Sequence, residues 1–240
     1  MIRLTTVLVA LTMVLAGCAS TPQPVHRHYP VSDAFRANPP RSILVVPVLN
    51  QSVNVNAPDD FLTAISKPIA ERGYYVFPVN LVKNVLRSNG LADAYRVHHA
   101  NTVELAKLFG ADAVLYVTIN QWTSKYDVLS TRVVAEFSYV LKSGETGAVL
   151  WKAHEKKTHT PEDDSDDNDF GSQDSGNGNI LVGLLSDMVD DAIDAAFTKV
   201  SPKFMPLARK ANYDAFNSKS GIPIGPYRLE RQKQAKKDSE

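Results

Sequence analysis

The side chains that could do chemistry in this chain include six histidines, a dense group of carboxylates and a single cysteine. His26 and His28 form an H-x-H pair that could bind a metal ion, but no third ligand lies nearby in the sequence. His98 and His99 are adjacent, so a helix or strand turns them in different directions and we expect both on the surface. These four histidines predict no metal centre.

His154 and His159 lie near the end of a predicted strand, without carboxylates at a matching spacing. The chain also lacks the G-x-S-x-G, H-E-x-x-H, Walker and G-x-G-x-x-G motifs. We therefore predict a protein that is not an enzyme and that holds no cofactor. A hydrolase whose site is assembled from dispersed residues stays as an alternative, because a catalytic site is recognised by geometry.

The carboxylates gather in residues 162–179, where seven Asp and Glu side chains stand among Gly, Ser and Asn. Such density suggests calcium, and an EF-hand loop needs Gly at its sixth place and Glu at its twelfth. Counted from Asp164, those places hold Asp169 and Ser175, so the motif fails. We interpret the segment as a self-repelling acidic loop, with weak cation binding as the alternative.

The single cysteine ends an apolar segment at the start of the chain. Arg3 gives a positive start, and residues 7–15 form an apolar run that suits a signal-peptide core. This run is too short to span a bilayer, which takes about 20 residues. The following Leu-Ala-Gly-Cys resembles the bacterial lipoprotein signal, in which the cysteine thiol takes a diacylglyceryl group. We predict that residues 1–17 are a signal peptide and that Cys18 is the lipidation site.

An acylated Cys18 would attach the chain to a membrane, since stable anchoring takes more than one acyl chain and a triacylated cysteine supplies them. The next residue is Ala19 and not the Asp that commonly retains lipoproteins in the inner membrane. We therefore expect the outer membrane, on its periplasmic face. With 26 basic and 26 acidic residues the chain has no net charge, which argues against nucleic acid as a partner.

Beyond the cysteine, residues 18–40 are rich in Pro, Ser, Thr and His and predict a flexible tether. A single folded domain is expected over residues 41–227. Its first part alternates apolar runs with amphipathic segments, which predicts strands and helices in turn. The expected strands are 42–49, 74–78 and 113–119, and the expected helices begin near Pro58, Asn80 and Asn101 and end at Gly73, Gly90 and Gly110.

The pattern changes in the second part of the domain. Residues 132–142 alternate, with Phe137 and Tyr139 on one side and Glu136 and Ser138 on the other, which predicts a half-exposed strand. A turn at 143–147 leads to a returning strand. We expect an α/β (α+β) fold in which βα units are followed by an antiparallel meander, with helices packed on one mixed sheet.

The last third of the chain contains two further segments. Residues 180–200 carry an apolar stripe at helical spacing, which predicts a helix docked on the sheet or, as the alternative, at a subunit contact. Residues 228–240 are polar and mainly basic and predict a frayed tail. Such a tail could touch anionic groups of the cell wall or of lipid.

The folded part resembles a family of bacterial outer-membrane lipoproteins of unknown function that is known from neisserial surface-antigen screens. The resemblance implies a fold similar to the amino-terminal domain of TolB, a relation to the oligomeric lipoprotein PelC, and CsgG-like lipoproteins as partners. It brings no catalytic residues. The segments that carry it are residues 38–48 (NPPRSILVVPV), 71–83 (ERGYYVFPVNLVK), 110–119 (GADAVLYVTI), 205–212 (MPLARKAN) and 221–227 (GIPIGPY).

These observations favour a non-enzymatic outer-membrane lipoprotein that acts as an accessory or scaffold in envelope assembly or export. We expect it to form a homo-oligomer or to bind other envelope lipoproteins. The alternative is a periplasmic module that binds glycan or peptidoglycan. That alternative rests on aromatic side chains expected to be exposed, namely Trp122, Tyr126 and Trp151.

Overall fold

The computed structural model describes residues 26–28, 30–127, 130–159 and 204–237. The predictions for Cys18, for the acidic segment 162–179 and for the helix over 180–200 lie outside these residues.

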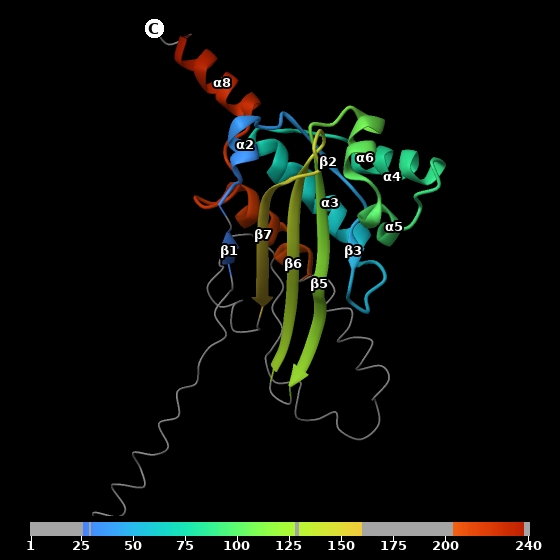
Figure 1. Ribbon diagram of the computed structural model, residues 1–240. Helices are drawn as coiled ribbons and strands as arrows, with labels where there is room; N and C mark the ends of the chain where they lie inside the picture. Colours follow the sequence, from blue (N-terminus) through green and yellow to red (C-terminus); the bar gives the residue numbers. More distant parts are fainter. Residues whose placement is uncertain (1–25, 29, 128–129, 160–203, 238–240) are drawn as a thin grey trace, which may run out of the picture.

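One mixed sheet of seven strands forms the centre of the domain, in the order β1-β7-β6-β5-β2-β4, with β3 also pairing with β5 (Figure 1). β2 pairs in parallel with β4 and β5, and β3 in parallel with β5, whereas β5-β6-β7 and β1 are antiparallel neighbours. This confirms the predicted fold class. The strands are β1 (His26–His28), β2 (Ser42–Val45), β3 (Leu49–Asn50), β4 (Tyr75–Val76), β5 (Ala113–Asp127), β6 (Ser130–Ser143) and β7 (Val149–His159).

The helices follow the predicted order, and most of their ends lie at the expected residues. Asn101 caps α6, its side chain accepting hydrogen bonds from the amides of Val103 and Glu104, and Gly73 ends α3 in the left-handed conformation. Asn80 does not cap α4, because that helix already begins at Val79. The helices are α2 (Asp33–Ala37), α3 (Ala57–Arg72), α4 (Val79–Ser88), α5 (Ala94–His99), α6 (Thr102–Phe109), a helix over residues 204–217, and α8 (Pro226–Lys237).

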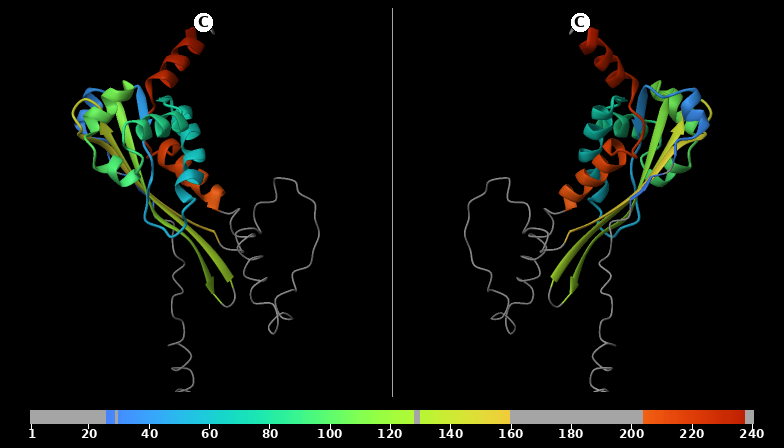
Figure 2. Two further views of the ribbon diagram at one scale, coloured as in Figure 1. Left: turned by 90° about the vertical axis from the view of Figure 1, so that its right-hand side faces the viewer. Right: turned by 90° about the vertical axis from the view of Figure 1, so that its left-hand side faces the viewer.

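Helices cover the sheet on both sides, but unequally (Figures 1 and 2). On one face, α3 and the helix over 204–217 bury the side chains that alternate along β5, β6 and β7, including Phe137, Tyr139 and Trp151. On the other face, α4, α5 and α6 pack on β2 and the first part of β5, around Leu44, Val114 and Tyr116. Among the helices of the described residues, none lies in front of the rest of that second face, over β6 and β7, in Figure 1.

Two regions expected to be irregular contain regular structure. Within the predicted tether, β1 pairs with β7, and α2 buries Phe35 while the Ser32 amide donates to the Leu150 carbonyl oxygen. Within the predicted tail, residues 226–237 form α8. These short elements have too few apolar residues to show a hydrophobic period in the sequence. Contacts with neighbouring strands and helices stabilise them instead.

Candidate functional site

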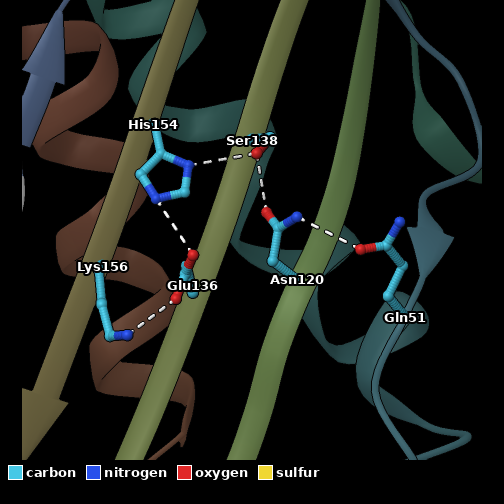
Figure 3. A network of polar contacts seen from close by, with 6 residues as sticks. All are labelled: Gln51, Asn120, Glu136, Ser138, His154 and Lys156. Atoms are coloured by element: carbon cyan, nitrogen blue, oxygen red, sulfur yellow. Dashed lines mark hydrogen bonds and ion pairs between the residues drawn. The ribbon is translucent and has the colours of Figure 1, made fainter.

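The uncovered face of β5, β6 and β7 is polar, and its side chains form a connected network (Figure 3). Ser138 on β6 lies opposite His154 on β7, and their Oγ and Nδ1 atoms are 3.2 Å apart. The other ring nitrogen of His154, Nε2, lies 3.2 Å from Oε1 of Glu136. Oε2 of Glu136 forms an ion pair with Nζ of Lys156 at 3.0 Å. Ser138, His154 and Glu136 therefore form a chain of polar contacts on one surface of the sheet.

The network continues onto β5 and the loop after β3. The Ser138 hydroxyl donates to Oδ1 of Asn120 at 2.8 Å, and Nδ2 of Asn120 faces Oε1 of Gln51 at 3.4 Å. The β5–β6 register shifts between Ile119 and Gln121, so Asn120 is the extra residue of a bulge. Because a bulge redirects the side chains around it, this irregularity lets Asn120 reach Ser138.

The hydrogen-bond partners of Ser138 and His154 determine what these two side chains do on this surface. A serine hydroxyl has one hydrogen, and here it is donated to Asn120. Ser138 Oγ then faces Nδ1 of His154, and Nε2 of the same ring faces the Glu136 carboxylate. These contacts form a polar ladder that runs across β5, β6 and β7.

The pairing of His154 with Glu136 was not indicated by the spacing of carboxylates around His154 in the sequence. The carboxylate comes from the neighbouring strand and not from β7 itself. The hairpin turn at 143–147 sets the register that places Ser138 opposite His154 and Glu136 opposite Lys156. That register is the signal from which the contact could have been derived.

The exposed aromatic surface that the sequence suggested is absent at both tryptophans. Trp122 is 2% exposed and Trp151 is 1% exposed, and both belong to the core under α3 and the helix over 204–217. Trp122 stacks on Phe204 with ring centroids 5.0 Å apart. The side chain of Tyr126 lies outside the described residues. The prediction of exposed tryptophans was therefore wrong.

The adjacent histidines of α5 point to different neighbours, as expected. His98 is half-buried and not on the surface, because its Nε2 contacts the Pro47 carbonyl oxygen at 3.0 Å and its ring meets the edge of Tyr116. Burial lowers the pKa of His98. His99 is exposed, and its Nδ1 lies 2.7 Å from the carbonyl oxygen of Tyr95. Neither environment joins the two rings at one ligand.

A second polar group is buried on the covered face, which the sequence did not reveal. Lys157 is 3% exposed, and its Nζ contacts Oε2 of Glu155 at 3.0 Å and Oδ2 of Asp214 at 2.6 Å. Nearby, the Tyr139 hydroxyl donates to Oδ1 of Asn212, and burial raises the pKa of Tyr139 well above its ordinary value. Both contacts join the sheet to the helix over 204–217, so they hold structure.

The segments that carry the family resemblance meet one another in the fold. Oδ2 of Asp112 accepts from the amides of Arg41 and Ser42 at 2.9 Å each, which ties the loop before β5 to the start of β2. The Tyr74 hydroxyl donates to the Pro223 carbonyl oxygen at 2.7 Å, which ties α3's end to the segment before α8. These motif residues act in folding, which fits a resemblance that brings no catalytic residues.

A cavity of about 780 Å³ lies at the end of the sheet where β5 and β7 begin. It is bordered by α2, α6 and the turn between β6 and β7, and its lining includes Lys107 and Glu145. In the described part of the chain, no group of three or more His, Cys, Asp or Glu side chains could hold a metal ion. No helix among the described residues is long and apolar enough to cross a membrane.

A family model described as "Putative lipoprotein GNA1162-like" matches residues 32–227. The chain belongs to the GNA1162-like lipoprotein family. A curated member from Neisseria meningitidis serogroup B, "Putative lipoprotein NMB1124/NMB1162", is 29% identical over 201 residues, which cover 83% of this chain and 86% of the relative. Membership in this family implies a lipid anchor in the bacterial envelope.

Solved structures agree with the family assignment. The crystal structure of lipoprotein GNA1162 from Neisseria meningitidis is 27% identical, covers 68% of this chain and 99% of that one, and superimposes with a TM-score of 0.50. A PelC dodecamer from Paraburkholderia phytofirmans is 18% identical over 57% of this chain and 81% of that one, with a TM-score of 0.40.

Proposed function

We propose that this GNA1162-like protein is a non-enzymatic lipoprotein of the outer membrane, facing the periplasm and anchored through acylated Cys18. Its α/β domain acts as a scaffold or accessory in envelope assembly or export. The observation that carries the proposal is the family match over residues 32–227 together with the lipoprotein signal that ends at Cys18.

The described start of the fold supports close attachment to the membrane. Only residues 19–25 separate Cys18 from His26, the first residue of β1. Even fully extended, this stretch spans about 28 Å between the two Cα atoms. β1 runs antiparallel to β7, so the chain reaches the sheet from the end where β7 finishes and where β5 turns into β6. The proposal therefore places that end toward the bilayer.

The scaffold role rests on the uncovered polar face of the sheet. Its network is half-buried and internally hydrogen-bonded, so its side chains are held in place for a partner. Ser138 is held between Asn120 and His154, which supports a surface with fixed side chains that a partner can bind. Partners of matching polarity are a second copy of the chain or another envelope lipoprotein of the CsgG-like kind.

Metabolic labelling with an alkyne fatty acid tests the anchor. Wild-type protein and a Ser20→Ala control should take up the label and sediment with outer membranes. Cys18→Ala should lose the label and leave the membrane fraction, because it lacks the thiol that accepts the lipid. Label retained by Cys18→Ala would contradict the proposal.

A further inference from the structure

A second open cleft, of about 560 Å³, lies between α3, the helix over 204–217 and α8. Its lining is polar and mainly basic. It is formed by Lys67, Ala70, Glu71, Tyr213, Asn217, Arg228 and Arg231.

Among the residues that line the cleft, positive charge exceeds negative charge. Three cations line it, but Glu71 is the one carboxylate among the lining residues, and it lies 3.7 Å from Lys67. Arg228 donates to the Glu71 carbonyl oxygen at 3.4 Å, a neutral acceptor. Arg231 is exposed and has no counter-ion in the described part of the chain. Arg72 adds a further positive charge beside Arg228. Burial lowers the pKa of Arg72, and repulsion from Arg228 acts in the same direction.

The cleft is built by a close contact between two glycines. The Gly225 amide donates to the Arg72 carbonyl oxygen at 2.9 Å, and the Tyr227 amide donates to the Gly73 carbonyl oxygen at 3.2 Å. A Cβ at Gly225 would collide with the carbonyl group of Gly73, so the two backbones touch. A 3.0 Å ion pair from Arg41 to Glu230 holds α8 from its other side. These contacts fix the backbone of the start of α8 beside the end of α3, and with it the positions from which Arg228 and Arg231 extend.

The cleft lies at the end of the sheet opposite to the one where the chain arrives from Cys18. In the register of the sheet, His26 of β1 and Asn50 of β3 lie in the same row. Paired residues of β7, β6 and β5 connect them across the sheet. Ile43, where β2 pairs with β4 near the cleft, is level with Ala113, about 20 Å along β5 from that row. Figure 1 shows α8 leaving the domain at this distant end.

We propose that this basic cleft binds the free carboxylates of peptidoglycan. The inference rests on the proposed function, because the anchor turns the cleft away from the outer membrane and toward the cell wall. Peptidoglycan is a carboxylate-bearing polymer, so it offers repeated negative charges to the Lys and Arg side chains. Tyr213, 55% exposed at the cleft, adds an aromatic surface against which a peptide or sugar can pack.

The test is cosedimentation of the full-length lipidated protein, in detergent, with purified Gram-negative sacculi. The variant Lys67→Glu/Arg231→Glu removes two cations from the cleft. The control Arg87→Glu/Arg96→Glu changes the net charge equally at exposed sites of α4 and α5. Because each exposed ion pair is worth about a two- to fivefold change in affinity, the cleft variant should bind about tenfold or more weakly. Sacculi whose carboxylates are amidated should bind no variant. Thermal melts of both variants check that they fold.

Equal binding by the cleft variant and the control would overturn the proposal, as would binding that survives amidation. Binding to vesicles containing phosphatidylglycerol but not to sacculi would also overturn it and would assign the cleft to a membrane. If the intact protein does not bind sacculi and the variant without residues 162–179 does, the proposal is also overturned for the intact protein. The cleft is then assigned to the chain's own acidic segment. Acylation of Cys18 is measured separately, so failure of the anchor and failure of the cleft give different results.

Discussion

Replacing Gly73 by Ala should destabilise the domain far more than the same change at Gly90, although both glycines have positive φ. Gly73 has φ 103° and Gly90 has φ 78°. A Cβ on Gly90 would meet nothing within 4 Å, so Gly90→Ala should cost only the left-handed strain of about 1–2 kcal/mol. A Cβ on Gly73 would lie 2.5 Å from Cβ of Arg228 and 2.9 Å from the Gly225 carbonyl oxygen. Overpacking adds about 1–3 kcal/mol.

The displaced chain would also weaken the backbone hydrogen bonds from Gly225 to Arg72 and from Tyr227 to Gly73, each worth about 0.5–1.5 kcal/mol. The total expected for Gly73→Ala is therefore about 3–8 kcal/mol. Urea denaturation followed by tryptophan fluorescence measures this, because both tryptophans of the chain are buried. Equal losses of unfolding free energy in the two variants would refute the argument that contact with α8, and not backbone strain, requires glycine at position 73.

Three further predictions concern polar contacts. Lys157→Met should lower the unfolding free energy by about 3–5 kcal/mol, because it leaves buried carboxylates without their cation, while the exposed Lys152→Met stays within about 0.5 kcal/mol of wild type; equal losses in the same urea assay would contradict this. Asp112→Ala should cost about 1–3 kcal/mol, since two amides at the start of β2 lose their acceptor, and a stability unchanged from wild type would contradict it. Since burial lowers the pKa of His98, the unfolded chain binds a proton below pH 6.5 that the folded chain does not. Wild type should therefore lose stability relative to His98→Gln as the pH falls below 6.5. Parallel pH profiles of the two proteins would contradict this prediction.

The alternation in residues 132–142 was sufficient to predict β6 and its buried side, because a strand of that length has a clear period of two. Trp122 could not be placed in this way. Its burial depends on the bulge at Asn120, which reverses the alternation along β5 so that an even-numbered residue points inward. The bulge arises from pairing with β6, and no local pattern in the sequence encodes it.

The polar contacts were hidden for a related reason. His154 meets Glu136, and Lys157 meets Asp214, across strand and helix neighbours that are distant in the sequence. β1 and α2 were hidden because their stability comes from β7 and not from their own periodicity. Glycine was easier to interpret: Gly73 and Gly110 end helices as predicted, because the left-handed conformation favours that residue.

The central claim is that an anchored domain presents the uncovered face of β5, β6 and β7 to an envelope partner. In-cell photocrosslinking tests it most directly, with a photoreactive amino acid at Lys152, an exposed residue of β7, and at Arg87 of α4 as the matched control. The account predicts a discrete crosslinked product from position 152 that is absent from position 87 and is lost in Cys18→Ala. No product at position 152, or the same products at both positions, would contradict it.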